Sequence, residues 1–188
     1  MKRLETPRLI LRDFSLDDLN DLYEYAQNPN VGPNAGWVAH ESIDISREKL
    51  RGYIKTDDAW AVELAESGKM IGSVGLHDDR LWERAGVKML GYVLSEKYWG
   101  KGYATEAARA AVRYAFEEAG LDLLTVYHYS YNTGSRRVVQ KCGFVCDGVL
   151  EDWCTLPDGN ITNEICYSMT RKDYEAAARE WDVEGLGV

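Results

Sequence analysis

A short segment with two glycines carries residue types suited to binding a phosphate group. It reads Trp99-Gly100-Lys101-Gly102-Tyr103-Ala104, and we call it the glycine loop. An apolar run from Val87 to Leu94 precedes it, and a run rich in alanine follows it. Glycine has no side chain, so an anionic ligand can approach the backbone closely there. If the alanine-rich run is a helix, its first amides and its dipole favour the same ligand, which predicts an anion site.

The spacing within the glycine loop argues against two common nucleotide-binding motifs. A Walker-type loop needs Gly-x-x-x-x-Gly-Lys followed by Ser or Thr, and no such residue follows Lys101. The dinucleotide fingerprint Gly-x-Gly-x-x-Gly is also broken, because position 105 is Thr. A nucleotide-dependent or dinucleotide-dependent enzyme is therefore disfavoured.

The elements that must position the glycine loop follow from the periodicity of the apolar residues. A period of two and short apolar runs predict strands at residues 6–14, 60–64, 70–76, 87–94, 121–129, 144–153 and 161–169. Apolar residues three and four apart predict helices at residues 15–26, 41–55, 104–119 and 132–142, with a polar helix at 171–181. Before that last helix, the order β-α-α-β-β-β-α-β-α-β-β indicates an α+β or mixed α/β domain.

Individual residues are expected to set the limits of these elements. Ser15 caps the first helix, Gly120 ends the third, and either Asn132 or Ser135 begins the fourth. Gly91 interrupts a strand, which marks a bulge or a close approach by another backbone. One face of the third helix is small enough to lie close to a sheet, and it carries Ala104, Ala107, Ala108, Ala111, Val112, Ala115 and Ala119.

The bulk composition narrows the class of protein. A chain of 188 residues suits one domain, and its net charge of −9 argues against a nucleic-acid partner. No apolar run reaches the roughly 18 residues of a membrane span, and residues 1–5 lack the apolar core of a signal peptide. From these two features we expect a cytoplasmic protein. The four cysteines match no zinc or redox spacing, so we expect no metal site.

Three separated segments together resemble the GNAT superfamily of N-acetyltransferases. The glycine loop matches its cofactor motif, Gln/Arg/Trp-x-x-Gly-x-Gly/Ala, in the Trp form common in the branch that acetylates N-terminal residues of ribosomal proteins, the RimJ/RimL-like branch. Residues 5–12, Glu-Thr-Pro-Arg-Leu-Ile-Leu-Arg, and residues 132–138, which run into Lys141-Cys142-Gly143-Phe144, are also similar to that branch. The resemblance covers residues 4–170.

The resemblance implies a fold and a reaction. The fold is a single acetyltransferase domain over residues 1–188, with a central, mostly antiparallel, twisted and splayed sheet flanked by helices. The reaction is transfer of an acetyl group from acetyl-CoA (coenzyme A) to a primary amine, by direct attack in a ternary complex. The acceptor is a small molecule or a protein N-terminus, and the enzyme is a monomer or homodimer.

The resemblance also assigns residues to the cofactor. A backbone amide of Val93 or Leu94 stabilises the oxyanion, and the same strand pairs with the pantetheine arm. Residues 99–105, from Trp99 to Thr105, hold the pyrophosphate, and Asn132 contacts the arm. The alternative for Asn132 is an ordinary turn residue. Further cations that reach the cofactor phosphates, or else simply lie on the surface, are Lys101, Arg136 and Arg137.

The catalytic assignments implied by the resemblance are more open. Ser135 matches the general acid of the branch, and its alternative is a helix cap. Glu151 and His128 are equal candidates for the base, although a structural histidine and a reaction without any single base also fit. Glu151 and Asp152 stand where the branch often has Arg-Glu. Alternative acids that share one strand face, opposite His128, are Tyr127, Tyr129 and Tyr131.

Acceptor binding is expected between the first two helices. The resemblance places the acceptor wall there, where Trp37 and His40 lie, and His77 is a further candidate. Trp37 is equally explained by packing alone. Because the glycine loop secures only binding of the cofactor, the alternative function is a non-catalytic acyl-CoA-binding sensor on the same fold.

Overall fold

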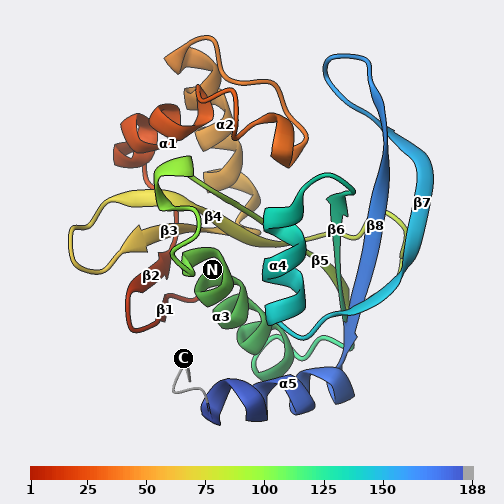
Figure 1. Cartoon of the computed structure of the whole chain (residues 1–188). Coiled ribbons are helices and arrows are strands. Elements are labelled where there is room, and N and C mark those ends of the chain that lie inside the picture. Colours follow the sequence, from red (N-terminus) through yellow and green to blue (C-terminus); the bar gives the residue numbers. More distant parts are fainter. Residues whose placement is uncertain (184–188) are drawn as a thin grey trace. The chain divides into compact units, whose positions relative to one another are not determined.

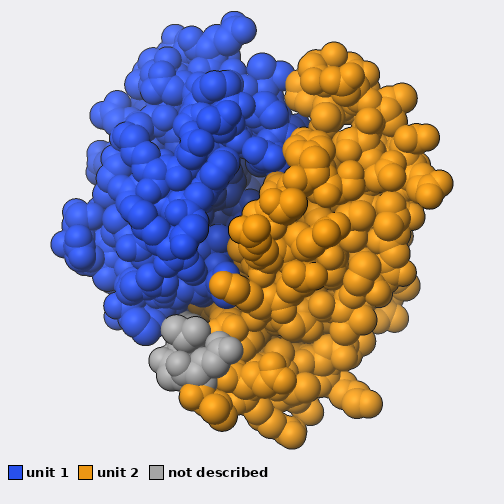
Figure 2. All heavy atoms as spheres, in the orientation of Figure 1, with its two compact units in different colours: residues 1–75, 92–107 blue, residues 76–91, 108–188 orange. Residues whose placement is uncertain are grey.

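The computed structural model describes residues 1–183, which divide into two compact units (Figure 2). Unit 1 comprises residues 1–75 and 92–107, and unit 2 comprises residues 76–91 and those from 108 onward. The division passes through β4 (Met70–His77), β5 (Val87–Leu94) and α3 (Tyr103–Glu117), so each of these elements contributes residues to both units (Figure 1). That the chain folds as one domain remains a prediction.

Unit 1 contains antiparallel strands in the order β1-β2-β3-β4. The first three are β1 (Leu4–Glu5), β2 (Leu9–Arg12) and β3 (Ala59–Leu64). The predicted alternation in β2 is confirmed, because Leu9 and Leu11 are fully buried. The expected strand at residues 6–14 is therefore real but shorter at both ends. The pair β1–β2 was not expected, since a strand of two residues gives no periodic signal.

Five helices lie wholly in unit 1. They are η1 (Leu16–Asp18), α1 (Leu19–Ala26), η2 (Pro33–Ala35), α2 (Ile43–Thr56) and η3 (Glu96–Tyr98). Ser15 begins the first of them as predicted, and its side chain forms a capping box with Asp18. The core beneath α1 and α2 is made by Phe14, Leu22, Tyr25, Ala26, Val31, Leu50, Ala59, Ala61 and Met70.

Unit 2 contains strands in the order β5-β6-β8-β7. β5 pairs in parallel with β6 (Leu123–Tyr129), and this ladder covers only Val87–Met89 of β5. β6 runs antiparallel to β8 (Ile161–Thr170) along its whole length, and β8 runs antiparallel to β7 (Val145–Thr155). β8 therefore lies between two strands that precede it in sequence. The short β5–β6 ladder agrees with the expected splay.

Three helices pack in unit 2, namely the larger part of α3 together with α4 (Thr133–Lys141) and α5 (Arg171–Val183). The alanine face of α3 is buried at Ala108, Ala111 and Ala115. Ala119 was expected on that face and is exposed instead, because the helix ends at Glu117 and Gly120 follows with a φ of +67°. The last helix is less polar than predicted, since its inner face buries Tyr174, Ala177 and Trp181.

Within residues 1–183, eight strands and five α-helices follow the predicted order, with β1 added at the start. All strand pairs given above are antiparallel except β5–β6, so the α+β prediction with a mostly antiparallel sheet is confirmed. No helix in this part of the chain is long and apolar enough to cross a membrane. The same residues contain no cluster of three or more His, Cys, Asp or Glu side chains that could hold a metal ion.

Candidate functional site

The backbone of the glycine loop bends through two glycines in the left-handed region. Gly100 has a φ of +73° and Gly102 a φ of +85°, and other residues adopt such angles only with strain. A Cβ atom on Gly100 would meet nothing within 4 Å, whereas one on Gly102 would lie 3.3 Å from an Nη2 atom of Arg8. Gly102 is therefore favoured chiefly by its conformation, and a Cβ atom there would require a small shift of the Arg8 side chain.

The indole of Trp99 ties the glycine loop to the end of β5. Its Nε1 atom donates a hydrogen bond of 2.8 Å to the carbonyl oxygen of Leu94, while 42% of the residue stays exposed. The amide of Ser95, the residue that follows β5, donates to the carbonyl oxygen of Ile71 of β4 at 2.8 Å. Trp99 thus fixes where the loop leaves the strand, a role that the motif alone did not specify.

The first turn of α3 begins directly at the glycine loop. The carbonyl oxygen of Gly102 accepts the first helical bond, from the amide of Glu106 at 3.0 Å. The amides of Tyr103 and Ala104 precede that bond, so helix geometry gives them no acceptor within the helix. Thr105 lies half-buried in the same turn. This arrangement of loop and helix start has the geometry expected of an anion site.

A buried carboxylate stands beside this anion site, and an arginine neutralises it. Glu106 is only 8% exposed and accepts from the Arg8 backbone amide at 2.9 Å and from Arg8 Nε at 2.6 Å. The Thr6 hydroxyl donates to the same carboxylate at 2.6 Å. Without Arg8, the negative charge of Glu106 would oppose an anionic ligand at the helix start.

Arg8 also holds the glycine loop directly. Its Nη1 atom donates to the carbonyl oxygen of Lys101 at 3.0 Å, and its guanidinium lies 4.5 Å from the ring centre of Tyr103. Sequence reasoning gave no role to Thr6, Arg8 or Glu106. One feature of the sequence could have pointed to them. Thr6 and Arg8 lie within the resembling segment 5–12, and Glu106 closely follows the glycine loop. The structure shows that these segments contact each other, since 98 positions separate Arg8 from Glu106.

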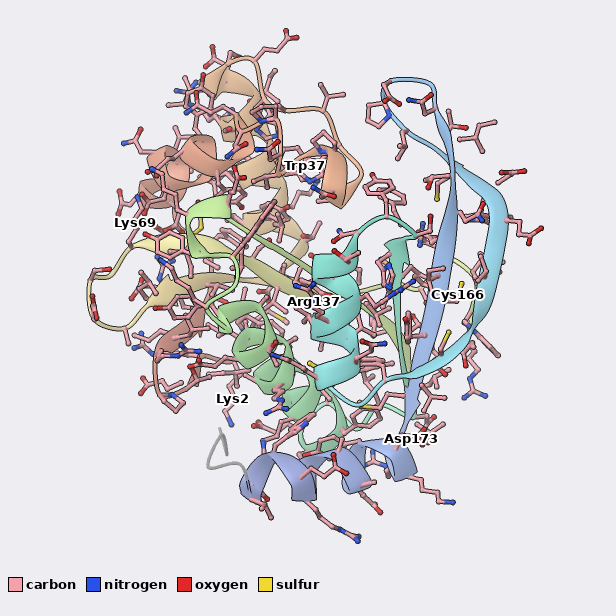
Figure 3. The ribbon with its side chains drawn as sticks, viewed as in Figure 1. Lys2, Trp37, Lys69, Arg137, Cys166 and Asp173 are labelled. Carbon is pink, nitrogen blue, oxygen red and sulfur yellow. The ribbon has the colours of Figure 1, made fainter. Side chains whose placement is uncertain are left out.

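The predicted phosphate-binding cations lie on the surface of their own units. Lys101 is exposed, with its ammonium 5.3 Å from the ring centre of Tyr98. Arg136 and Arg137 are exposed on α4, where Figure 3 labels Arg137. Their contact with a phosphate remains a prediction.

Asn132, rather than Ser135, begins α4. The Asn132 side chain accepts a hydrogen bond of 2.9 Å from the backbone amide of Ser135, which identifies Asn132 as the N-cap. The explanation of Ser135 as a cap is therefore wrong. Ser135 is half-buried in the first turn of the helix, and a cap does not account for its hydroxyl.

The two candidate bases have different surroundings. His128 is 4% exposed, its Nδ1 atom lies 2.8 Å from the carbonyl oxygen of Tyr129, and burial is the main cause that lowers its pKa. Its Nε2 atom is buried without a hydrogen-bond partner among residues 1–183. Glu151 is exposed on β7, next to an irregular stretch of the β7–β8 ladder. A neutral imidazole with one vacant nitrogen is chemically able to accept a proton.

The three tyrosines considered as alternative acids do not all lie on one strand face as expected. β6 ends at Tyr129, so Tyr131 lies beyond the strand. Tyr129 and Tyr131 stack with ring centres 5.5 Å apart. Tyr127 donates to Asp79 at 3.0 Å, and burial, followed by that carboxylate, raises its pKa well above the usual range. A hydroxyl held in this way is a poor proton donor.

A buried carboxylate on β8 was not found from the sequence. Glu164 is 4% exposed and pairs with Arg80 at 2.9 Å, and Arg80 lies 4.6 Å from the ring centre of Tyr127. No local pattern distinguishes Glu164 from an exposed strand residue.

His77 is half-buried at the end of β4, and its ring lies 3.0 Å from where a Cβ atom of Gly91 would be. The close neighbour of Gly91 is therefore the His77 side chain, and not another backbone as the sequence suggested.

A cavity of about 110 Å³, which we call the α1–α2 cavity, lies in unit 1. Its apolar and aromatic wall is formed by Leu22, Tyr25, Ala26, Trp37, Tyr53 and Val93. Its polar lining residues are His40 and Lys49. Trp37 and His40, which the sequence placed at the acceptor wall, therefore share one cavity, with ring centres 5.1 Å apart; Trp37 also packs against the core.

Comparisons with known proteins agree with this geometry. The family model described as "Acetyltransferase (GNAT) domain" matches residues 8–145. The uncharacterised N-acetyltransferase YoaA of Bacillus subtilis is 28% identical over 155 residues, which cover 80% of this chain and 86% of that protein.

Solved structures share the fold. A GNAT-family acetyltransferase from Bacillus anthracis superposes with a TM-score of 0.83 at 23% identity, over 91% of this chain and 99% of that one. A putative ribosomal-protein-serine acetyltransferase from Vibrio cholerae superposes with a TM-score of 0.73 at 21% identity, over 90% of this chain and 97% of that one.

Proposed function

The chain belongs to the GNAT acetyltransferase family, and we propose that its reaction is the transfer of an acetyl group from acetyl-CoA to a primary amine. The observation that carries this proposal is the glycine loop. Two left-handed glycines, an open space above Gly100 and the first amides of α3 suit a pyrophosphate. Arg8 supports the proposal because it neutralises Glu106, the carboxylate nearest to that site.

The transfer needs three events at the reacting atoms. The neutral amine nitrogen forms a bond to the thioester carbonyl carbon, the carbon–sulfur bond breaks, and the proton lost by the amine balances the proton gained by the thiolate. We propose that an amide of Val93 or Leu94 donates to the oxygen that becomes negative in between. A donor fixed on a strand contributes more than water does, because it needs no reorientation.

The proton-transfer roles are proposals for residues of unit 2. Ser135 is proposed to protonate the departing thiolate, because it stands where the motif of the branch has its general acid, in the first turn of α4. His128 is proposed to accept the amine proton, supported by its Nε2 atom, which has no hydrogen-bond partner among residues 1–183, with Glu151 as the competing base. Asn132 is proposed to contact the pantetheine arm, in addition to capping α4.

The acceptor is proposed to bind at the α1–α2 cavity beside Trp37 and His40. His77, Lys101, Arg136 and Arg137 keep their proposed contacts with acceptor or phosphate. The proposal of a monomer or homodimer rests on the resemblance of the sequence, and that of a cytoplasmic enzyme rests on the composition of the sequence.

Release of free thiol from acetyl-CoA tests this function. The purified chain should release thiol only when an amine is present, and mass spectrometry should find the amine heavier by one acetyl group. N-terminal peptides, free amino acids, polyamines and aminoglycosides form the panel. Tight binding of acetyl-CoA without turnover of any amine would favour the sensor instead, and absence of binding would overturn both functions.

A further inference from the structure

The α1–α2 cavity has an unusual charge for a chain with a net charge of −9. None of the described residues that line it is acidic, and its one charged lining residue is Lys49. The Lys49 ammonium lies 5.2 Å from the ring centre of Tyr53 and has no acidic partner within the described part of the chain. The mouth of this cavity is therefore locally positive.

Two carboxylates on neighbouring elements are held by other groups. Glu24 of α1 binds Lys69 at 2.8 Å and Lys97 at 2.6 Å. Glu96 of η3 accepts hydrogen bonds from Asn28 and Asn30. A positively charged guest would therefore meet Lys49 with no acidic residue among the lining residues of the cavity.

The remaining polar groups of the cavity are neutral. Burial and, next, the charge of Lys49 lower the pKa of His40, whose Nδ1 atom lies 2.7 Å from the Ser46 hydroxyl. Burial raises the pKa of Tyr25 and of Tyr53, so both hydroxyls keep their protons. An apolar guest meets aliphatic and aromatic surface there, and an anion meets only Lys49.

The size of the cavity limits the apolar guest. Engineered cavities of about 150 Å³ hold one benzene molecule, or roughly 25 Å³ for each carbon. At about 110 Å³, the α1–α2 cavity has space for about four carbon atoms. The cavity is partly open, so this volume describes the part of a guest that lies inside it; a leucine or valine side chain fits there in full.

We propose that the acceptor is an aliphatic α-amino acid, with its side chain in the α1–α2 cavity and its carboxylate on Lys49. This inference rests on the proposed function and narrows the acceptor among the amines that the function allows. An α-amino acid carries amine, carboxylate and side chain on one carbon, so it presents the anion next to the apolar group. Polyamines and aminoglycosides carry only cations and are rejected.

The test compares leucine with leucinamide, which has the same amine and side chain but no carboxylate. Leucine should be acetylated with a kcat/KM at least about tenfold higher, as expected for loss of one charge-assisted contact. Spermidine and kanamycin should give lower values than leucine. Equal rates for leucine and leucinamide, or a preference for spermidine, would overturn the proposal.

A matched pair of variants assigns the carboxylate contact. Lys49→Glu should raise the KM for leucine at least about tenfold and should not raise that for leucinamide, whose cation the new carboxylate attracts. Lys55→Glu makes the same charge change on the same helix, away from the cavity, and should leave both unchanged. Ala26→Leu fills the cavity, so it should favour alanine over leucine as substrate; thermal melts check that each variant folds.

A failure of the proposed function remains distinguishable from a failure of this inference. If no amine is acetylated, leucine binding is measured by ligand-detected nuclear magnetic resonance on the wild-type chain. Binding that Lys49→Glu abolishes and Lys55→Glu preserves would support the cavity while refuting the function. Absence of leucine binding together with absence of turnover would refute both.

Discussion

Replacing Glu106 by glutamine should loosen the glycine loop, because it removes the charge that holds Arg8. The carboxylate accepts from Thr6 at 2.6 Å, from the Arg8 amide at 2.9 Å and from Arg8 Nε at 2.6 Å. Glutamine keeps one acceptor oxygen but turns an NH₂ group toward a guanidinium that can only donate. At least one charge-assisted hydrogen bond is therefore lost, and none replaces it.

The size of this effect follows from the burial of the two partners. A hydrogen bond to a charged group contributes about 1.5–3 kcal/mol when it is fully buried. Glu106 is 8% exposed but the Arg8 side chain is 44% exposed, so solvent screening brings the loss to roughly 1–2 kcal/mol. For a domain of this size, that corresponds to a decrease in Tm of about 2–8 °C.

Differential scanning calorimetry and titration with acetyl-CoA measure the two consequences of Glu106→Gln. We expect the lower Tm as the main consequence. The acetyl-CoA affinity should change by less than tenfold, because the loosened loop weakens binding while the removed negative charge favours the anion. Glu48→Gln is the control, because that carboxylate pairs with Arg51 on the exposed face of α2 and its loss should change neither quantity. An unchanged Tm in Glu106→Gln would refute the reasoning.

Three further perturbations test other parts of the site. Gly102→Val should weaken acetyl-CoA binding by at least about tenfold, since strain at a φ of +85° and a side chain against Arg8 both distort the loop. Gly159→Val imposes similar strain in an open turn and should preserve the affinity; equal effects would contradict the assignment. Ser135→Ala should lower turnover about 10²-fold with acetyl-CoA affinity retained, whereas lost stability alone would indicate a structural role. His128 lowers stability in acid: its folded pKa is below that of the unfolded chain, so stability is complete above about pH 6.5 and falls as the pH drops below that value. His128→Gln should flatten this dependence of the urea midpoint, and an unchanged slope would exclude His128 as its cause.

Periodicity predicted most elements because each strand or helix long enough to repeat its pattern leaves a local signal. β5 lies at Val87–Leu94, as the apolar run indicated, whereas the third helix ends at Glu117, three residues before the predicted Gly120. The family was also predictable, since three motifs in order are specific, and the match over residues 8–145 confirms it. The two-residue strand β1 left no such signal.

The details of the site could not be read from local patterns. Asn132 and Ser135 are both residue types that cap helices, and only the coordinates identify Asn132 as the cap. The ion pair of Arg8 with Glu106 joins residues 98 positions apart, so no periodicity reveals it. Glu164 is buried while Glu151 is exposed, and irregular pairing from Leu150 to Cys154 prevents counting faces along β7.

Calorimetric titration with acetyl-CoA and with S-acetylpantetheine, which lacks the pyrophosphate and the nucleoside, tests the central claim most directly. The claim is that the glycine loop and the first amides of α3 bind the pyrophosphate. Charge-assisted contacts to that group should make acetyl-CoA bind at least about tenfold more tightly than S-acetylpantetheine. Equal affinities for the two compounds, or no binding of acetyl-CoA, would contradict it.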